Sequence, residues 1–289
     1  MARFIDPRVD WAFKRIFGSE DTKECLITFL NGLFEDELVI KDVTFAKTEK
    51  LGLRPDDRGV VFDVYCVTNE GKHVIVEMQK KEQEYFADRA LYYTARAIVQ
   101  QGVRGIWDYH LAPVYTVCFM DFVSDSPMLK EFRTDLVLTD LQTRQRVSDR
   151  MRIVYLQLPL FDKHTEAECM YIFDCWIYIM KNMNMFEQMP FSEKYPVFRK
   201  LAEIGDLRKL SREELELYDE DIKNMRDIYA TRKFDEKRGM EKGMKKGMEK
   251  GMAKEKIATA YRLLSMGLSE AQVATATELP LEEIQKMKE

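Results

Sequence analysis

Two carboxylates and an amide stand on two consecutive segments that are otherwise rich in valine. Asp63 lies within VVFDVYCVT, residues 60–68, and Glu77 and Gln79 lie within VIVEMQKK, residues 74–81. Both segments have the length and composition of strands, and residues two apart on a strand share a face. Glu77 and Gln79 therefore point the same way. Because burying such a charge is costly unless it is paired or binds a metal, the pattern indicates chemistry on this face.

The turn between the two segments determines which residues face each other. The three-residue loop 69–71, Asn-Glu-Gly, predicts a bulged hairpin in which the glycine is the left-handed residue. Pairing the strands outward from this loop brings Asp63 opposite Glu77 and Val61 opposite Gln79. Opposed Cβ atoms in an antiparallel pair lie about 4.5–5.5 Å apart. We therefore predict that the two carboxylates share one site.

Like charges opposed across a sheet are destabilising, and three arrangements relieve the repulsion. One carboxyl has a raised pKa, both are exposed to water, or a cation binds between them. The neighbours on this face, Val61, Tyr65 and Ile75, are apolar, which weakens the explanation by exposure. Mg²⁺ prefers oxygen ligands and typically takes one or two carboxylates plus substrate phosphate oxygens. The pair indicates a divalent metal site, with a surface hairpin of two solvated acids as the alternative.

The overall charge limits which partners the whole surface attracts. The 289 residues are 46% apolar and 33% charged, with a formal charge of −5. This composition is typical of one large globular core with appendages. The net negative charge gives no global attraction to nucleic acid, so any such attraction must come from a local patch.

The sequence shows no targeting or zinc-binding pattern. No apolar run reaches the length of a membrane span, and the N-terminal MARFIDPRVDW is not typical of a signal peptide. The five cysteines form no CxxC or Cys/His pattern. An odd number of cysteines without a secretion signal predicts a reducing, cytoplasmic location. We expect no membrane partner.

The remaining periodicities predict an α/β core followed by helices. Asp6 and Pro7 have the character of an N-cap and a first helical position, and Gly18 ends that helix. Further helices are expected over residues 22–34 and 84–101. Additional strands and a helical region are expected at residues 39–47, 114–122, 135–141, 152–158 and 165–230.

The C-terminal part differs in composition from the rest of the chain. Four glycines recur every four residues from Gly239 to Gly251, each followed by methionine. Residues 232–256 hold ten Lys or Arg against five Asp or Glu, a local net charge of +5. Beyond the repeat, residues 269–272 (Ser-Glu-Ala-Gln) form a capping-box pattern and Pro280 opens a last short helix.

These patterns divide the chain into four predicted parts. They are a core at residues 1–160, a helical extension at 161–231, a low-complexity basic repeat linker at 232–256 and a small helix-turn-helix-like module at 257–289. In the module, Glu278 occupies a turn that suits glycine better, and the last helix is acidic, which is a poor face for a DNA groove. Contact with a protein partner, including a second copy of the chain, is therefore an alternative to DNA binding there.

In their order and spacing these residues resemble a known family. Asp63 followed by Glu77-x-Gln79 is similar to the active site of PD-(D/E)XK nucleases. The segments DWAFKRIFG and RALYYTARAI, the GMEK-like repeat and the tail LLSMGLSEAQVA resemble the Rpn family of recombination-promoting nucleases, also described as transposases. The resemblance covers most of the chain. It implies a restriction-endonuclease-like α/β core and a metal-dependent DNA endonuclease that serves recombination, DNA mobility or defence.

The resemblance also implies roles for individual residues. Asp63 and Glu77 would hold Mg²⁺, with the backbone carbonyl of Met78 as a third ligand and Mn²⁺ or Ca²⁺ as alternative ions. Gln79 stands where the wider superfamily usually has lysine, and an amide orients water but does not stabilise charge as an ammonium does. Asp10 on the first helix would be an outer ligand.

Three further residues are candidates for contact with DNA: Lys81, Arg89 and Tyr93. Lys81 follows Gln79 on the same strand face, and Arg89 and Tyr93 lie one helical turn apart. Plain helix packing is the alternative for Arg89 and Tyr93.

Other acids offer competing interpretations. An i,i+4 ion pair with Lys14 is the alternative for Asp10. Asp56 and Asp57 superficially match the "PD" of the superfamily name, but a turn is favoured there. Asp121 ends an apolar strand and would complete a three-acid site with Asp63 and a distant glutamate. A non-catalytic interaction protein that keeps the nuclease fold and binds partners through its C-terminal module is the rival function.

Overall fold

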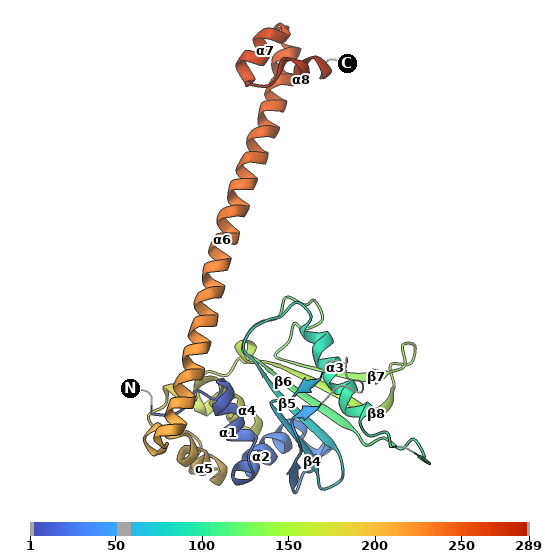
Figure 1. Ribbon diagram of the computed structural model, residues 1–289, viewed down its shortest axis with the longest axis vertical. Coiled ribbons are helices and arrows are strands. Elements are labelled where there is room, and N and C mark those ends of the chain that lie inside the picture. The colour runs from blue at the N-terminus through green and yellow to red at the C-terminus, as the bar shows by residue number, and fades with distance from the viewer. Residues whose placement is uncertain (1–2, 51–58, 104, 288–289) are drawn as a thin grey trace. The chain divides into compact units, whose positions relative to one another are not determined.

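A computed structural model describes residues 3–50, 59–103 and 105–287 (Figure 1). The chain forms two compact units, Met1–Ile222 and Lys223–Glu289, and each is described by itself. Asp56 and Asp57 lie outside the described residues. In the described part of the chain, no helix is both long enough and apolar enough to cross a membrane.

The first unit is built on a six-stranded mixed sheet. In spatial order its strands are β1 (Val43–Phe45), β4 (Val64–Thr68), β5 (His73–Gln79), β6 (Val114–Met120), β8 (Arg146–Gln157) and β7 (Arg133–Thr139). β4 and β5 form an antiparallel hairpin, β5, β6 and β8 run parallel, and β7 returns antiparallel to β8. Two short strands, β2 (Glu49–Lys50) and β3 (Val60–Val61), pair separately.

Helices cover both faces of this sheet. They are α1 (Asp10–Phe17), α2 (Lys23–Phe34), α3 (Phe86–Val99), α4 (Ile172–Asn182) and α5 (Pro196–Gly205), followed by the start of α6 (Arg212–Ser265). Figure 1 shows α3 on one face and α1, α2 and α4 on the other. The right-handed βαβ rule applies to the connection from β5 through α3 to β6, because these strands are parallel neighbours. The predicted α/β core is therefore confirmed.

Aromatic rings fill the space between the sheet and the helices α1, α2 and α4. Phe119 of β6 lies 5.0 Å from Phe29 and 5.7 Å from Phe13, measured between ring centroids. Phe17 and Trp176 extend the cluster at 5.5 Å. Such offset and edge-to-face ring pairs add to the stabilisation from burial. This cluster holds α1 against the sheet immediately behind β5 and β6.

The hairpin register follows the prediction near the turn. Gly71 has a φ of 76°, and Tyr65 pairs with Ile75 as expected. The predicted pair of Val61 with Gln79 is wrong. Val61 belongs to β3, which ends before Asp63 and pairs with β2, so Val61 lies opposite Glu49. Gln79 instead pairs with Met120 of β6.

The first helix begins later than predicted. Its N-cap is Val9 and its first residue is Asp10, so the assignment of Asp6 as N-cap and Pro7 as first helical residue is wrong. The carboxylate of Asp6 instead accepts hydrogen bonds from the backbone N–H and the guanidinium of Arg8. This local pairing closes a turn, since the N–H of Val9 also donates to the carbonyl of Asp6.

Most other boundaries shift by only a few residues. The end of α1 at Gly18 and the second helix are confirmed, whereas the strand expected at 39–47 is only three residues long. β8 begins six residues before the expected 152–158 because it continues the hairpin with β7. Short 3₁₀ helices join the elements at Glu20–Thr22, Glu35–Glu37, Leu158–Leu160, Glu166–Glu168, Met183–Met185 and Leu207–Lys209.

The second unit consists of the later part of α6 with α7 (Glu270–Thr277) and α8 (Leu281–Lys286). Ala260, Val273 and Ile284, one from each helix, form its small buried core. The capping box at Ser269 is confirmed. Glu278 has a φ of 55° and forms an ion pair with Lys256 at 2.6 Å.

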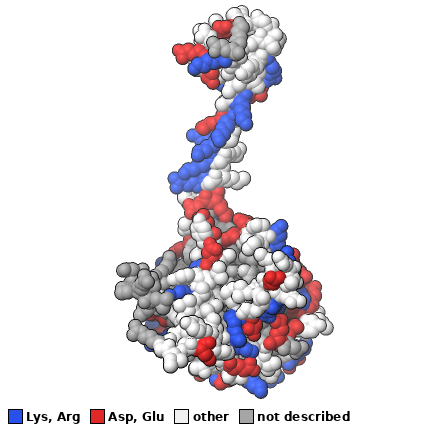
Figure 2. All heavy atoms as spheres, turned by 90° about the vertical axis from the view of Figure 1, so that its right-hand side faces the viewer, with Lys and Arg blue, Asp and Glu red and all other residues white. Residues whose placement is uncertain are grey.

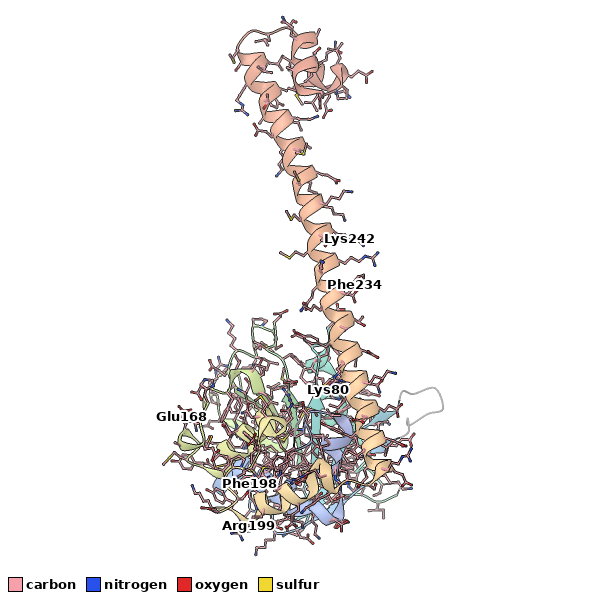
Figure 3. The ribbon with its side chains drawn as sticks, turned by 90° about the vertical axis from the view of Figure 1, so that its left-hand side faces the viewer. Lys80, Glu168, Phe198, Arg199, Phe234 and Lys242 are labelled. Atoms are coloured by element: carbon pink, nitrogen blue, oxygen red, sulfur yellow. The ribbon has the colours of Figure 1, made fainter. Side chains whose placement is uncertain are left out.

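The glycine repeat lies within α6 and is exposed. Figure 2 shows Lys and Arg side chains along this helix, and Figure 3 shows Phe234 and Lys242 extending from it. The methionines of the repeat are 57–78% exposed. An added Cβ at any of the four glycines would meet no atom within 4 Å. Glycine is therefore not required there by local contacts.

A glycine in α2 allows a close helix contact that the sheet layer depends on. A Cβ at Gly32 would lie 2.9 Å from Cγ2 of Ile172 and 3.2 Å from the backbone nitrogen of Phe173 in α4. We expect Gly32→Ala to lower the free energy of unfolding of the first unit by about 1–3 kcal/mol, because overpacking outweighs the gain in helix propensity. Urea unfolding followed by tryptophan fluorescence measures this change.

Gly243→Ala is the matched control, since it makes the same substitution in a helix with open surroundings. All three tryptophans, at positions 11, 107 and 176, belong to the first unit. The control should leave the tryptophan-monitored transition unchanged. An unchanged transition in Gly32→Ala would show that α2 and α4 do not approach as described.

Candidate active site

The candidate site lies where β4 stops pairing with β5. Val64, the first residue of β4, pairs with Val76, while β5 continues to Gln79. Glu77 and Met78 therefore have β6 on one side and Asp63, the residue before β4, on the other. The departure of the chain at Asp63 thus opens the edge of β5 to side chains.

Two hydrogen bonds join the predicted pair of carboxylates. The backbone N–H of Asp63 donates to Oε1 of Glu77 at 3.2 Å. The backbone N–H of Met78 donates to Oδ2 of Asp63 at 2.8 Å. Each carboxylate is thus held by the backbone of the other segment. The structure therefore brings Asp63 and Glu77 together as the register predicted, and one oxygen of each is oriented by an N–H donor.

The two carboxyls disfavour each other's charge. Glu77 is only 5% exposed, and burial, followed by the negative charge of Asp63, raises the pKa of Glu77 well above its ordinary value. Burial also raises the pKa of Asp63, against the lowering effect of the hydrogen bond from Met78. Of the three remedies for like charges, exposure is therefore excluded for Glu77. A raised pKa without metal and a bound cation remain.

The backbone carbonyl of Met78 points toward the same opening. Within a strand, the N–H and C=O of one residue point to the same side. The N–H of Met78 points at Asp63, so its carbonyl also points away from β6. The next residue points the other way. The carbonyl of Gln79 faces β6, where it accepts a hydrogen bond at 2.8 Å from the N–H of Asp121, the residue that follows β6 in the chain.

This donor set fits a hard divalent cation. Asp63, Glu77 and the carbonyl of Met78 offer oxygen atoms only, which suits Mg²⁺ with water and phosphate oxygens completing its shell. Among the described residues, no group of three or more His, Cys, Asp or Glu is placed to hold a metal. The chain therefore offers two acids, and Asp10 does not join them as a third.

Charged side chains approach the pair from helices on both faces of the sheet. The charges of Lys14 in α1 and Arg89 in α3 lower the pKa of both carboxyls, in opposition to burial. Asp10 raises the pKa of Asp63, and its carboxylate forms an ion pair with Lys14 at 2.8 Å. The i,i+4 pair was one interpretation of Asp10, and the structure shows that pair beside the site.

Tyr93 contacts the residue before Asp63, and Arg89 lies against Tyr93. The ring of Tyr93 meets the ring of Phe62 edge to face, with centroids 5.5 Å apart. The guanidinium of Arg89 lies 5.7 Å from the centroid of Tyr93 and donates to Oε1 of Gln83 at 2.7 Å. Both residues therefore combine helix packing with a position beside the site.

The structure places the remaining candidates, Gln79, Lys81 and Asp121, less firmly at the site. Gln79 is the last residue of β5 and is half-buried, on the face it shares with Glu77. Lys81 lies two residues beyond the strand and is exposed, so strand alternation no longer places its side chain. Asp121 forms an ion pair with Arg8 at 3.3 Å. No three-acid group is present among the described residues, which removes the interpretation of Asp121 as a third catalytic acid.

Lys14 is the residue that sequence reasoning missed. Its position four residues after Asp10 suggested only a helix pair, because nothing local places α1 beside the hairpin. Burial lowers the pKa of Lys14, but the hydrogen bond to Asp10 and the negative charges of Asp10, Asp63 and Asp221 together outweigh this effect, so the pKa is raised. Lys14 is therefore a permanent positive charge near the carboxylates.

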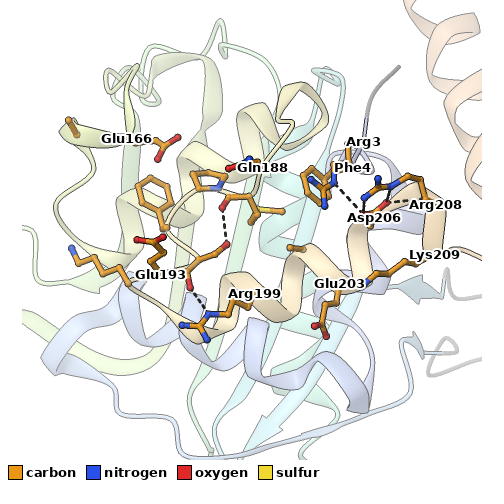
Figure 4. Close-up of a pocket in the computed structure, with 17 residues that line it drawn as sticks. Arg3, Phe4, Glu166, Gln188, Glu193, Arg199, Glu203, Asp206, Arg208 and Lys209 are labelled. Carbon is orange, nitrogen blue, oxygen red and sulfur yellow. Dashed lines mark hydrogen bonds and ion pairs between the residues drawn. The ribbon is translucent and has the colours of Figure 1, made fainter.

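A larger cavity elsewhere in the first unit does not compete with this site. Its volume is about 860 Å³, and it is lined by Arg3, Phe4 and residues between 166 and 209, none of which belongs to the β4–β5 hairpin (Figure 4). Its most buried acid, Asp206, is already held by Arg208 at 2.6 Å and by Arg3 at 3.3 Å. These ion pairs occupy the buried carboxylate of Asp206.

Comparison with known families agrees with the geometry. A family model described as PD-(D/E)XK nuclease family transposase matches residues 7–233 of the 289-residue chain. The matched range contains both carboxylates, Lys14 and Arg89, and the six-stranded mixed sheet with its helices is the nuclease-like core. No curated protein and no solved structure matches the chain.

Repulsion between the two carboxyls should appear as a stability difference. Asp63→Asn keeps the acceptor for the N–H of Met78 and removes one charge. In EDTA we expect the variant to be more stable than wild type by up to about 1 kcal/mol, the scale of a cross-strand pair. With millimolar Mg²⁺ the difference should shrink or reverse, because only wild type gains the full binding energy. Urea unfolding of both proteins measures it.

The same difference should depend on pH. A carboxyl whose pKa is raised in the folded state adds stability at low pH, and that stability is lost as pH rises through the folded pKa. The advantage of Asp63→Asn in EDTA should therefore be absent below pH about 4, near the ordinary carboxyl pKa, and grow as pH rises. If EDTA gives no difference at any pH and Mg²⁺ does not stabilise wild type, the carboxyls do not share a site.

Proposed function

The chain belongs to the PD-(D/E)XK nuclease family transposases, and from this membership we propose that it is a metal-dependent endonuclease that hydrolyses phosphodiester bonds in DNA. The observation that carries the proposal is the pair of the buried Glu77 and the half-buried Asp63, joined through backbone hydrogen bonds at 3.2 and 2.8 Å. Breaking DNA strands in this way would serve recombination, DNA mobility or defence.

Three groups would hold the metal: the carboxylates of Asp63 and Glu77 and the carbonyl of Met78. Mg²⁺ is the proposed ion, with Mn²⁺ or Ca²⁺ as alternatives, because all the donors are oxygens. Such an ion polarises the scissile phosphate and lowers the pKa of water. Asp10 would act as an outer group that hydrogen-bonds water near the site.

The chain's own side chains orient the reacting groups. Gln79 shares the face of Glu77, and its amide would hold the attacking water by hydrogen bonds. Because an amide carries no charge, the charge that develops on phosphate would be met by Lys14 and Arg89, which flank the carboxylates. Lys14 is held for this role by its ion pair with Asp10.

DNA would be held at two places of different character. Arg89, Tyr93 and Lys81 would contact the strand near the scissile phosphate. The basic repeat at residues 232–256, whose Lys and Arg between 233 and 254 are exposed, would add a non-specific electrostatic attraction that the overall charge of −5 does not supply. Contact with a protein partner or a second copy through the C-terminal module is the alternative role for that part.

The central test removes the charge of Glu77 alone. Glu77→Gln keeps the shape and the acceptor for the N–H of Asp63, which matters because Glu77 is buried. We expect plasmid nicking in Mg²⁺ to fall by at least about 100-fold, the scale of a lost catalytic electrostatic group. Circular dichroism and DNA binding in EDTA should remain close to wild type.

Glu70→Gln is the matched control, since Glu70 lies in the turn of the same hairpin and pairs with Lys72 on the surface. This variant should nick plasmid at the wild-type rate. Wild-type nicking by folded Glu77→Gln would overturn the site. If wild-type protein nicks no DNA in Mg²⁺ or Mn²⁺, the rival function as an interaction protein is favoured.

The C-terminal unit can be tested separately. Deleting residues 239–289 keeps the contacts that bind the start of α6 to the first unit, namely the Tyr218 hydroxyl with the N–H of Asp6 and Asp221 with the N–H of Trp11. We expect metal-dependent nicking to persist at low salt, with weaker DNA binding and a smaller salt dependence. Loss of all nicking even at low salt and high enzyme concentration would make the C-terminal part a portion of the catalytic unit.

A further inference from the structure

A hollow of about 550 Å³ lies beside the carboxylate pair, at the start of α3. We name it the tyrosine pocket after the three tyrosines in its lining. The lining residues that matter here are Glu84, Tyr85, Asp88, Arg89, Tyr92 and Tyr93. Tyr85, Tyr92 and the two acids take no part in the proposed metal site.

The lining of the tyrosine pocket includes residues that lie close to Asp63 in the chain or contact its neighbour. Gly59, four residues before Asp63, also lines it. The ring of Tyr93 packs against Phe62, the residue next to Asp63, at 5.5 Å between centroids. Arg89 also lines the pocket, with its guanidinium 5.7 Å from the centroid of the Tyr93 ring. A group bound here therefore lies beside the chain segment that carries Asp63.

The lining offers flat faces suited to stacking. Tyr85 is 66% exposed and Tyr92 is 41% exposed, so part of each side chain is open to solvent. The planar guanidinium of Arg89 lies over the rings of Phe86 and Tyr93, at 5.8 and 5.7 Å from their centroids. Aromatic rings and arginine planes stack on nucleobases whatever the sequence, since every base has a π-face.

The acids decide which part of a nucleotide the pocket accepts. Glu84 and Asp88 repel phosphate, so the sugar-phosphate backbone is directed away from the pocket and toward the metal-binding groups. Carboxylates accept hydrogen bonds from the exocyclic amino group of a base, as in the recognition of cytosine. Adenine carries such an amino group too, whereas thymine has no exocyclic amino group.

A base reaches a pocket beside the strand only after leaving the helical stack. Removing it from a paired duplex costs a few kcal/mol, and the cost is smallest when the base is mismatched or single-stranded. We propose that the tyrosine pocket holds the unstacked base next to the scissile phosphate, so that single-stranded or locally unpaired DNA with adenine or cytosine there is the preferred substrate. This inference rests on the proposed function for its phosphate but has its own test.

The test measures binding of the full-length protein in EDTA, where no strand is cut. Fluorescence anisotropy compares labelled single strands of dA, dC and dT with a blunt mixed-sequence duplex. We expect dA and dC strands to bind more tightly than both dT and duplex. Tyr85→Ala and Tyr92→Ala should each weaken dA and dC binding by about 5- to 150-fold, the range measured for loss of one base–aromatic stack, while Tyr85→Phe retains it.

Tyr171→Ala is the matched control, because Tyr171 is 68% exposed and lies at the start of α4 on the opposite side of the sheet. It should bind every strand as wild type does. Asp88→Asn should reduce the preference for dA and dC over dT. Equal binding of single strands and duplex by wild type, or tyrosine variants that bind dA and dC unchanged, would overturn the inference.

Cleavage by wild type in Mg²⁺ separates this inference from the proposed function. A duplex with a central unpaired bubble should be cut faster than the same sequence fully paired. Equal cutting of both, together with unchanged tyrosine variants, rejects the pocket and leaves the nuclease standing. If wild type cuts no DNA yet binds dA and dC through Tyr85 and Tyr92, the proposed function fails and the base pocket is upheld.

Discussion

The active-site geometry depends on the point at which β4 stops pairing with β5. Val64, the first residue of β4, forms the pair farthest from the hairpin turn. β5 continues for three residues beyond its partner Val76. The N–H of Met78 thus has no strand opposite it, and the carboxylate of Asp63 takes that position. One side chain therefore ends the sheet pairing and begins the site. The position of the Asp63 carboxylate therefore depends on the edge of β5.

Packing of the neighbouring strand residue helps offset the unfavourable burial of Glu77 beside Asp63. Met78 pairs with Phe119, and Phe119 belongs to the aromatic cluster with Phe13 and Phe29. Phe13 lies on α1, the helix that also carries Lys14. The same helix therefore anchors the sheet through its buried face and supplies a positive charge through its exposed face. A change that displaces α1 would therefore alter both the stability of the core and the charge near the carboxylates.

The parts of the site that sequence could predict are local. The register of Asp63 with Glu77 follows from Gly71 and from the two-residue period of strands. The break before Asp63 could not be predicted, because it depends on β3 pairing with β2, a segment of two residues in each strand. The approach of Lys14 and Arg89 depends on how helices pack on two faces of the sheet. Periodicity identifies those helices but does not say which of their charges meet.

Arg89 connects the carboxylate pair with the tyrosine pocket. Its guanidinium donates to Gln83 and lies over two rings, so its plane is fixed before any ligand arrives. A fixed guanidinium loses less side-chain entropy on binding than a mobile lysine. In the proposed mechanism Gln79 carries no charge, so Arg89 and Lys14 would supply the positive charge that a lysine on the strand would otherwise provide. Arg89 belongs to α3, whose first turns also line the tyrosine pocket, so the proposed phosphate and base positions would depend on the same helix.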